Sequence, residues 1–219
     1  MAKLKPYQSE FLQLTLDLGV LKVGGEYKLK SGRISPYFFN AGLFNTGKSL
    51  MALGEAFASA IIESGIEFDM LFGPAYKGIP LVAAVAIAMA AKHGRDVPYA
   101  FNRKEAKDHG EGGIIVGSQL RGKILLIDDV ITAGTAIRES VTLLGSFPEC
   151  ELVAVAVAMD RQERAPDSTL SAIQSVEKDF NLRVVSIIGL SSILELAKSK
   201  FSDTTCAALE KYRAEFGVF

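Results

Sequence analysis

Apolar residues follow a helical spacing at the start of the chain. Residues 6–18 place several leucines on one side of a helix, which predicts an amphipathic N-terminal helix. Short strands are expected at residues 27–29 and 36–40, on either side of a turn. We interpret the chain from about residue 1 to residue 45 as a small N-terminal lobe.

Short apolar runs and helical patterns alternate in the middle of the chain, after a helical pattern at residues 49–64. This alternation predicts an α/β fold in which helices flank a mostly parallel sheet. We expect a single domain, with its core from about residue 46 to 190 and a helical segment at residues 191–219. The predicted strands are 68–72, 97–101, 123–127, 151–159 and 184–188, and the helices between them are 79–93 and 135–145.

Composition is that of an ordinary globular domain. The chain has 219 residues, of which 49% are hydrophobic and 22% are charged. Its net charge of −1 argues against a nucleic-acid partner held by bulk positive charge. Cys150 and Cys206 form no Cys-x-x-Cys pair, so neither a zinc site nor a disulfide is indicated. A reducing cytoplasm is the expected compartment.

No segment is expected to cross a membrane or to direct secretion. Residues 1–6 are polar and basic, unlike the start of a secretory signal. The longest apolar stretch, residues 79–91, contains Pro80 and is shorter than the roughly 18 residues of a membrane span. It predicts a buried core helix instead.

The most specific chemistry lies at the end of the strand predicted at residues 123–127. Asp128 and Asp129 follow this apolar run directly, and a turn of small and hydroxyl-bearing residues precedes the next helix. Carboxylates at the C-terminal edge of a strand lie where open α/β sheets bind ligands. The turn would offer backbone N–H groups to an anion at a helix N-terminus. Acids beside an anion site suit a phosphorylated ribose.

A second loop, residues 73–80, also lies between a strand and a helix. Gly73 and Gly78 allow close backbone approach, and Lys77 supplies a positive charge for a phosphate. Alone, such a loop is typical of an ordinary turn. Its place two strands before the acidic pair favours a second anion-binding loop.

Three other features are open to two interpretations each. The charged run at residues 103–113 is typical of a solvated loop and equally of a mobile lid. The cations and aromatics of residues 28–40 could pack against the core or cover a ligand. Arg161, after a predicted strand, can bind a carboxylate through two parallel hydrogen bonds, and Arg164 is the competing candidate, which we interpret as a surface residue. His93, by contrast, ends a helix and complements its dipole, so we interpret it as structural.

The acidic segment resembles the phosphoribosyl-diphosphate (PRPP) signature of type I phosphoribosyltransferases. The resemblance implies that family's fold, with a small N-terminal hood lobe over the α/β core. Asp128 and Asp129 would hold the ribose hydroxyls, and Tyr76 and Lys77 would contact pyrophosphate. A cis peptide bond is expected between Ala75 and Tyr76. The PRPP motif would comprise Asp128, Asp129, Val130, Ile131, Thr132, Ala133, Gly134, Thr135 and Ala136, the last five of which bind the 5-phosphate.

The charged run is similar to the lid loop of the orotate phosphoribosyltransferase family, and residues 28–40 are similar to its hood. By this resemblance Lys107, His109 and Lys30 would be catalytic and would also meet PRPP. The lid would in addition bring Arg103 and Lys104 to pyrophosphate, partly across a dimer interface. The residues expected to bind orotate are Phe38, Phe39, Thr132 and Arg161.

The resemblance implies a defined reaction. A 5-phosphoribosyl group would pass from PRPP to orotate, giving orotidine 5′-monophosphate and diphosphate in pyrimidine (UMP) biosynthesis. Mg²⁺ would be carried by PRPP, with no dedicated metal ligands, and Asp128 and Asp129 would meet it through ribose or water. A cytoplasmic homodimer is expected. Two alternatives stay open: a phosphoribosyltransferase for another base, and a regulator that senses PRPP without catalysis.

Overall fold

The computed structural model describes residues 3–107, 113–132 and 134–218, without the side chains of residues 106 and 107. The N-terminal part contains α1 (Pro6–Asp17), β1 (Leu21–Lys28), β2 (Ile34–Phe39), the 3-10 helix η1 (Ala41–Leu43) and α2 (Gly47–Ser64). The core contains β3 (Met70–Gly73), α3 (Gly78–His93), β4 (Tyr99–Lys107), β5 (Gly113–Gly117), β6 (Gly122–Val130), α4 (Thr135–Leu144), β7 (Cys150–Asp160), α5 (Ala172–Phe180) and β8 (Arg183–Gly189). The chain continues through α6 (Leu190–Lys200) and α7 (Asp203–Phe216).

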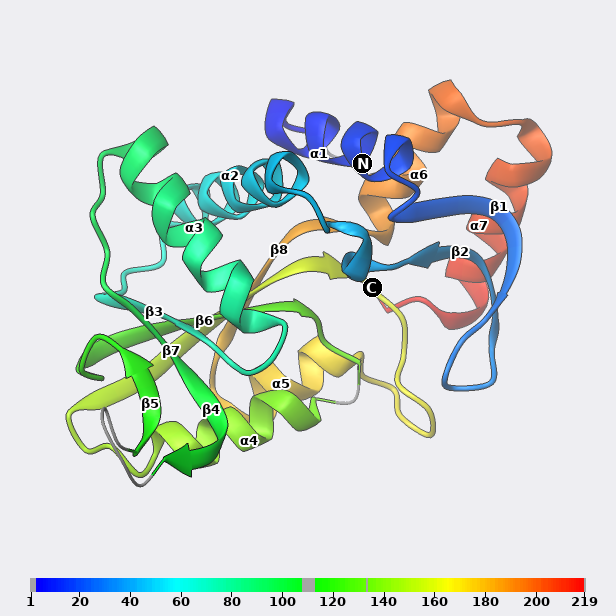
Figure 1. The fold of residues 1–219 in the computed structure, drawn as a ribbon. Helices are drawn as coiled ribbons and strands as arrows, with labels where there is room; N and C mark the ends of the chain where they lie inside the picture. Colours follow the sequence, from blue (N-terminus) through cyan, green and yellow to red (C-terminus); the bar gives the residue numbers. More distant parts are fainter. Residues whose placement is uncertain (1–2, 108–112, 133, 219) are drawn as a thin grey trace.

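A six-stranded sheet in the order β5-β4-β3-β6-β7-β8 forms the centre of the molecule (Figure 1). Strands β4, β3, β6, β7 and β8 run parallel, and only β5 pairs antiparallel, with β4. Helices connect the parallel strands and cover both faces of the sheet. The predicted α/β fold with a mostly parallel, helix-flanked sheet is therefore confirmed.

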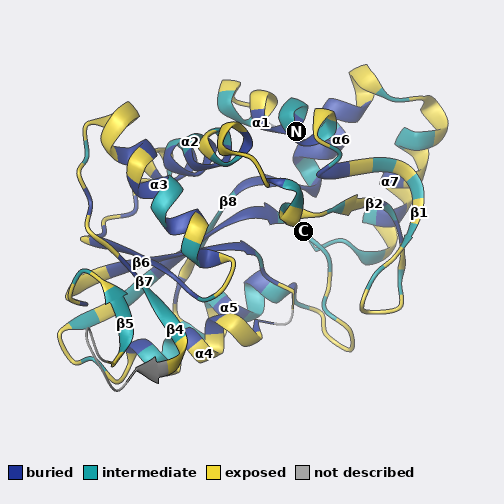
Figure 2. Ribbon diagram, in the orientation of Figure 1, coloured by how far each residue is buried: buried dark blue, intermediate teal, exposed yellow. Residues whose placement is uncertain are grey.

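Strand β6 shows why its apolar run is continuous. Leu125 and Ile127 pack with α2 and α3 on one face, while Ile124 and Leu126 pack towards α4 and α5 on the other. All four side chains are fully buried. Figure 2 shows the central strands of the sheet in dark blue, whereas the edge strand β5 is largely teal. Side chains of a strand alternate between faces, so a strand covered on both sides must be apolar at every position.

The N-terminal lobe is built on an antiparallel hairpin of β1 and β2. Figure 1 places this hairpin beside α6 and α7, at the opposite end of the chain. Tyr37 of β2 and Tyr212 of α7 meet edge to face, with ring centroids 6.0 Å apart. The C-terminal helix thus supports the lobe that overhangs the sheet.

Several boundaries differ from the prediction. Strand β6 continues through Val130, so the acidic pair lies within the strand and not after it. Residues 103–107, expected in a polar interruption, extend β4, which pairs with the unpredicted strand β5. Strand β1 begins at Leu21, well before the expected residue 27, and α5 was not predicted. Charged residues on β4 and glycines in β1 gave these strands no apolar alternation.

Candidate active site

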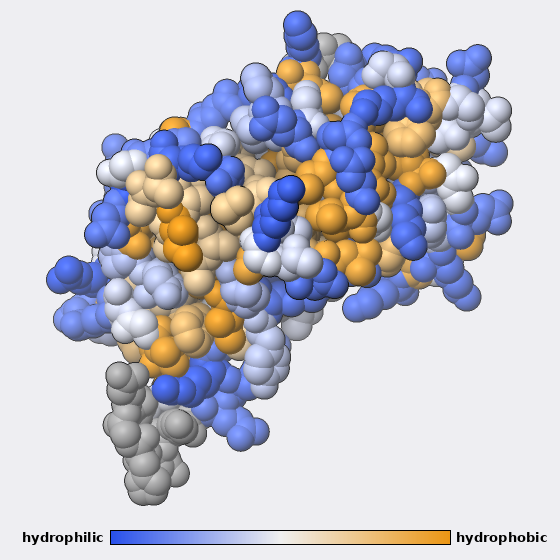
Figure 3. Space-filling view, turned by 45° about the horizontal axis from the view of Figure 1, so that its top comes forward, coloured by the Kyte–Doolittle hydropathy of each residue, from blue (hydrophilic) through white to orange (hydrophobic). Residues whose placement is uncertain are grey.

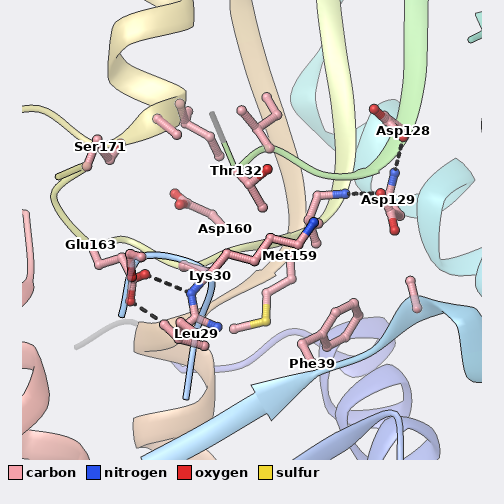
Figure 4. Close-up of a pocket in the computed structure, with 18 of the residues that line it drawn as sticks. Leu29, Lys30, Phe39, Asp128, Asp129, Thr132, Met159, Asp160, Glu163 and Ser171 are labelled. Carbon is pink, nitrogen blue, oxygen red and sulfur yellow. Dashed lines mark hydrogen bonds and ion pairs between the residues drawn. The ribbon is translucent and has the colours of Figure 1, made fainter. Parts of the chain in front are cut away.

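A cavity of about 750 Å³ lies at the C-terminal ends of β3, β6 and β7, beneath the β1–β2 hairpin. This is the edge at which open α/β sheets bind ligands. Figure 4 shows Asp128 and Asp129 on one side of the cavity and Glu163 on the other, with Thr132 and Asp160 between them. The hood contributes Lys30, Phe38 and Phe39, and the core contributes Tyr76, Lys77, Asp128, Asp129, Val130, Ile131, Thr132, Ala136 and Arg161.

The acidic pair is buried yet reaches the cavity. Asp128 is 9% exposed and Asp129 is 7% exposed. Oδ1 of Asp128 accepts a hydrogen bond from the backbone N–H of Asp129, and Oδ1 of Asp129 accepts one from Val130. Burial, and then the neighbouring charge of Asp129, raises the pKa of Asp128 to about 6. The pair therefore presents fixed carboxylate oxygens, which suit ligand hydroxyl groups.

Lys77 joins the loop after β3 to the acidic pair. Its ammonium nitrogen lies 2.5 Å from Oδ2 of Asp129. The loop is held on its other side by Asn102 of β4, whose Oδ1 accepts a hydrogen bond from the backbone N–H of Ala75 at 2.9 Å. The peptide bond between Ala75 and Tyr76 is cis, as predicted.

Close backbone contact shapes this loop. A Cβ atom on Gly78 would lie 2.7 Å from the carbonyl carbon of Gly73 and 2.6 Å from Cδ of Pro74. Glycine at position 78 is what allows α3 to begin so close to the end of β3. The loop therefore sets Lys77 beside the acids through backbone packing.

The turn after β6 leads into the N-terminus of α4. Gly134 caps this helix with φ 72°, a left-handed conformation that favours glycine. Thr132 and Ala136 line the cavity, so the start of the helix borders it. The helix dipole and the first N–H groups favour an anion there. Ala133, one of the expected phosphate ligands, lies outside the described residues.

The hood supplies both a cation and aromatic surface. Lys30 extends from the turn between β1 and β2 into the cavity, and Phe39 lies near its floor (Figure 4). Phe38 of β2 stacks on Tyr27 of β1, with ring centroids 5.9 Å apart, and this contact holds the two strands of the hairpin together. The three hood residues predicted to meet ligand thus reach one cavity with the acidic pair.

Arg161 lines the cavity but already binds a carboxylate of the chain. Its Nε and Nη2 donate to the two oxygens of Glu163, at 2.9 Å and 3.1 Å. The guanidinium also lies over the ring of Tyr37, 4.4 Å from its centroid. The side edge of the guanidinium, one of its two bidentate edges, is therefore occupied by Glu163.

Two of the predicted lid residues, Arg103 and Lys104, have described side chains, and neither is among the described residues that line the cavity. Arg103 donates to the backbone carbonyl of Gly113 across the β4–β5 hairpin, and Lys104 pairs with Glu139 of α4 at 3.6 Å. The backbone of Lys107 pairs with that of Gly113, but its side chain and all of His109 lie outside the described residues. Their roles stay predictions.

Three acidic or polar residues of the site were not predicted from the sequence. Asp160, at the end of β7, lines the cavity, and burial raises its pKa. Glu163 binds Arg161, and Asn102 holds the loop after β3. Asp160 and Glu163 lie close to Arg161 in the sequence, one residue before it and two residues after it. Their closeness to a candidate arginine could have indicated them. For Asn102 the sequence carried no signal.

Among residues 3–107, 113–132 and 134–218, no group of three or more His, Cys, Asp or Glu side chains could hold a metal ion. Across the same described ranges, no helix combines the length and apolar character needed to cross a membrane.

Comparisons with known proteins agree with this geometry. The Phosphoribosyl transferase domain family matches residues 43–187. An orotate phosphoribosyltransferase of Thioalkalivibrio sulfidiphilus (strain HL-EbGR7) is 58% identical, covering 98% of this chain and all of its own length. One of Pectobacterium carotovorum subsp. carotovorum (strain PC1) is 55% identical over the same shares.

A solved structure gives the same result in three dimensions. The crystal structure of an orotate phosphoribosyltransferase of Francisella tularensis is similar with a TM-score of 0.88 and 46% sequence identity. The match covers 95% of this chain and 100% of that one. The resemblance drawn from the PRPP signature, the lid and the hood is thereby confirmed at the level of family and fold. The chain belongs to the orotate phosphoribosyltransferase family of type I phosphoribosyltransferases.

Proposed function

We propose that this cavity transfers the 5-phosphoribosyl group of PRPP to orotate, giving orotidine 5′-monophosphate and diphosphate for pyrimidine biosynthesis. One observation carries the proposal: the acidic pair and Lys77 share a single cavity with the hood and Arg161. The first set suits an activated ribose, and the second suits a base bearing a carboxylate. Membership of the family supports the same reaction.

Each group has a distinct task in binding PRPP. Asp128 and Asp129 accept hydrogen bonds from the ribose 2- and 3-hydroxyls. The turn from Thr132 to Ala136 donates backbone N–H groups to the 5-phosphate at the start of α4. Lys77 exchanges its ion pair with Asp129 for the pyrophosphate, which frees that carboxylate for the sugar.

Catalysis follows from charge stabilisation. Attack by orotate N1 at the anomeric carbon breaks the bond to pyrophosphate, and negative charge accumulates on the leaving group. Lys30, Lys107 and His109 are the cations that would stabilise this charge, with Arg103 and Lys104 in support. Fixed charges act most strongly on the atoms where charge develops, so the protein needs no covalent nucleophile.

The donor set of the site fits a magnesium ion that arrives with PRPP. Mg²⁺ prefers phosphate and water oxygens with one or two carboxylates, and the acidic pair supplies carboxylates at the cavity wall. Asp128 and Asp129 would hold it through ribose hydroxyls or water. When bound, the ion supplies positive charge for the pyrophosphate.

Selectivity for orotate is assigned to the hood and Arg161. Phe38 and Phe39 offer aromatic surface to a planar base, and Thr132 lines the same cavity. Arg161 would bind the orotate carboxylate, a group that uracil and purines lack. A purine-specific relative would have no use for this arginine.

A homodimer in the cytoplasm completes the proposal. Apolar side chains for a partner are available on α2 and α3, where Met51 is 57% exposed and Ile87 is 69% exposed. Figure 3 shows apolar patches among the charged side chains on one face. A partner there would allow lid residues to serve the neighbouring subunit. Cys150 and Cys206 are free thiols, which suits a reducing compartment.

The test is a product assay with competing bases. Purified protein is mixed with Mg²⁺, PRPP and orotate, and loss of orotate absorbance is followed together with release of pyrophosphate. We expect one pyrophosphate for each orotate consumed, and no turnover with uracil, adenine or hypoxanthine. Turnover with a purine but not with orotate would favour a salvage enzyme. Binding of PRPP without consumption would favour a regulator.

A further inference from the structure

Arg161 is held on several sides before any substrate is present. Tyr37 lies against the face of the guanidinium, and Ser35 accepts a hydrogen bond from Nη2 at 3.2 Å. Glu163 takes the side edge through Nε and Nη2. None of these three hydrogen bonds uses Nη1, so this nitrogen retains donors for a ligand. The restraints therefore use Nε and both N–H groups of Nη2, and they leave Nη1 for a ligand.

Glu163 is itself fixed, from the far end of the chain. The hydroxyl of Tyr212, on α7, donates to Oε2 of Glu163 at 2.6 Å. The backbone of Glu163 forms a bridge with Gly217, and the carbonyl of Phe216 accepts a hydrogen bond from Arg164 at 2.8 Å. The Glu163 carboxylate is held by two side chains and by its own backbone, so we do not expect it to move away from Arg161 when a ligand binds.

Charge and burial strengthen this arrangement. The side chains of Arg161 and Glu163 are 17% and 13% exposed, so the ion pair is largely shielded from solvent. Burial raises the pKa of Tyr212 to about 12, and its hydrogen bond to Glu163 acts in the same direction. Tyr212 therefore remains a hydroxyl donor throughout the neutral range.

We propose that Glu163, held by Tyr212, is a positioning residue that orients Arg161 for the carboxylate of orotate. This inference rests on the proposed function and extends it to the C-terminal helix. Glu163 would not touch the substrate. Instead it would keep Nε and Nη2 of the guanidinium occupied, so that the two N–H groups of Nη1 meet the incoming carboxylate. Donors that are already fixed lose less conformational freedom when a ligand binds. The effect of Glu163 should therefore appear in orotate affinity more than in turnover.

The alternative role for Glu163 predicts the opposite sign. If Glu163 only competed with orotate for Arg161, removal of its charge would tighten orotate binding. If it positions Arg161, the same removal weakens binding, because the guanidinium gains freedom and loses a charge-assisted partner. Glu163→Gln preserves the shape of the side chain, so the sign of its effect distinguishes the two roles.

The test measures orotate affinity in Glu163→Gln, Tyr212→Phe and the double variant. Steady-state kinetics give KM for each substrate, and calorimetry gives orotate binding independently of turnover. We expect orotate KM and Kd to rise about tenfold in Glu163→Gln and about threefold in Tyr212→Phe, with PRPP KM and kcat changed by less than about twofold. Tyr212 also contacts Arg161 directly. The double variant should nevertheless differ from Glu163→Gln by less than about threefold, because most of the effect of Tyr212 is transmitted by its hydrogen bond to Glu163.

Matched controls separate positioning from general structure. Glu195→Gln removes a carboxylate that pairs with Lys198 outside the cavity, and Tyr7→Phe removes a hydroxyl bonded to Glu63. Both should leave orotate KM unchanged. If Glu163→Gln does not fold, Tyr212→Phe alone carries the test through its orotate-specific rise.

Each contrary result has one meaning. Unchanged or tighter orotate binding in both variants would overturn the positioning role. An equal loss of orotate and PRPP affinity would assign the cluster to general stability instead. If the fold-changes in orotate affinity of the two single variants multiply in the double variant, Tyr212 acts independently of Glu163, and the proposed coupling is overturned. If the native protein binds orotate without consuming it, the proposed function fails while the binding comparison still decides this inference.

Discussion

The ammonium nitrogen of Lys77 lies 2.5 Å from Oδ2 of Asp129, which joins the loop after β3 to the end of β6. The two groups are assigned to different parts of PRPP, one to pyrophosphate and one to ribose. In the free protein each satisfies the charge of the other. Binding of substrate therefore replaces one ion pair by two sets of contacts, and neither charge is left buried without a partner.

Loss of Lys77 should weaken PRPP binding specifically. In Lys77→Met the pyrophosphate loses a cation, and Asp129 loses its partner in the free protein. We expect KM for PRPP to rise about tenfold or more, with orotate KM within about twofold of the native value. Steady-state kinetics with each substrate varied in turn measures both. A PRPP KM equal to that of the native protein would remove Lys77 from the pyrophosphate site.

Asp128 should lower the stability of the folded protein above about pH 6. Its folded pKa is about 6, whereas an unfolded chain gives Asp a pKa of about 3.9. Between these values the unfolded state releases its proton while the folded state retains it. Stability therefore falls as pH rises through this window, and the penalty is complete above it.

Asp128→Asn removes that penalty. We expect its Tm to exceed that of the native protein at about pH 7.5, and the difference to shrink at about pH 4.5. Scanning calorimetry at the two pH values measures this, with Asp17→Asn as the control because Asp17 is exposed. A variant with lower Tm at both values would contradict the assigned pKa. Catalysis should fall in the same variant, since the ribose loses a carboxylate.

Gly78→Ala should disturb the loop after β3. The added Cβ would meet backbone carbon of Gly73 at 2.7 Å, so the start of α3 must move. We expect a loss of about 1–3 kcal/mol in the free energy of unfolding, with weaker PRPP binding. Gly47→Ala is the matched control, because no atom lies within 4 Å of a Cβ built there. Equal stability of the two variants in denaturant titrations would show that the close contact is not required.

Lys107→Ala should reduce turnover more than binding. Its charge is assigned to pyrophosphate as it departs, and such a contact strengthens on the way to the transition state. We expect kcat to fall by about a hundredfold or more while Kd for Mg·PRPP changes by less than about threefold. Single-turnover kinetics and calorimetry separate the two quantities. Unchanged kcat would remove Lys107 from the mechanism.

The sequence predicted the parts of the site that combine two local signals. Asp128 and Asp129 end an apolar run, and Lys77 lies between glycines that join a strand to a helix. Both patterns are local, so a single sequence contains them. Parallel pairing of β3 with β6 then brings the two loops to one edge of the sheet.

Features that depend on distant pairing could not be predicted. Residues 103–107 are charged on both sides of the strand, and only pairing with β5 makes them extended. Glu163 binds Tyr212, which lies 49 residues further along the chain. No local pattern relates these two residues, because the contact is created by α7 packing beside the hood. The long-range support of Arg161 therefore becomes visible only in the structure.

The central claim is that Asp128 and Asp129 hold the ribose of PRPP, and calorimetric titration with Mg·PRPP tests it most directly. Native protein, the Asp128→Asn/Asp129→Asn double variant and the control Glu195→Gln would be compared at about pH 8, above the pKa of Asp128. The account predicts normal binding by the native and control proteins, and a loss of about a hundredfold or more in the double variant. Equal affinity of all three proteins would contradict it.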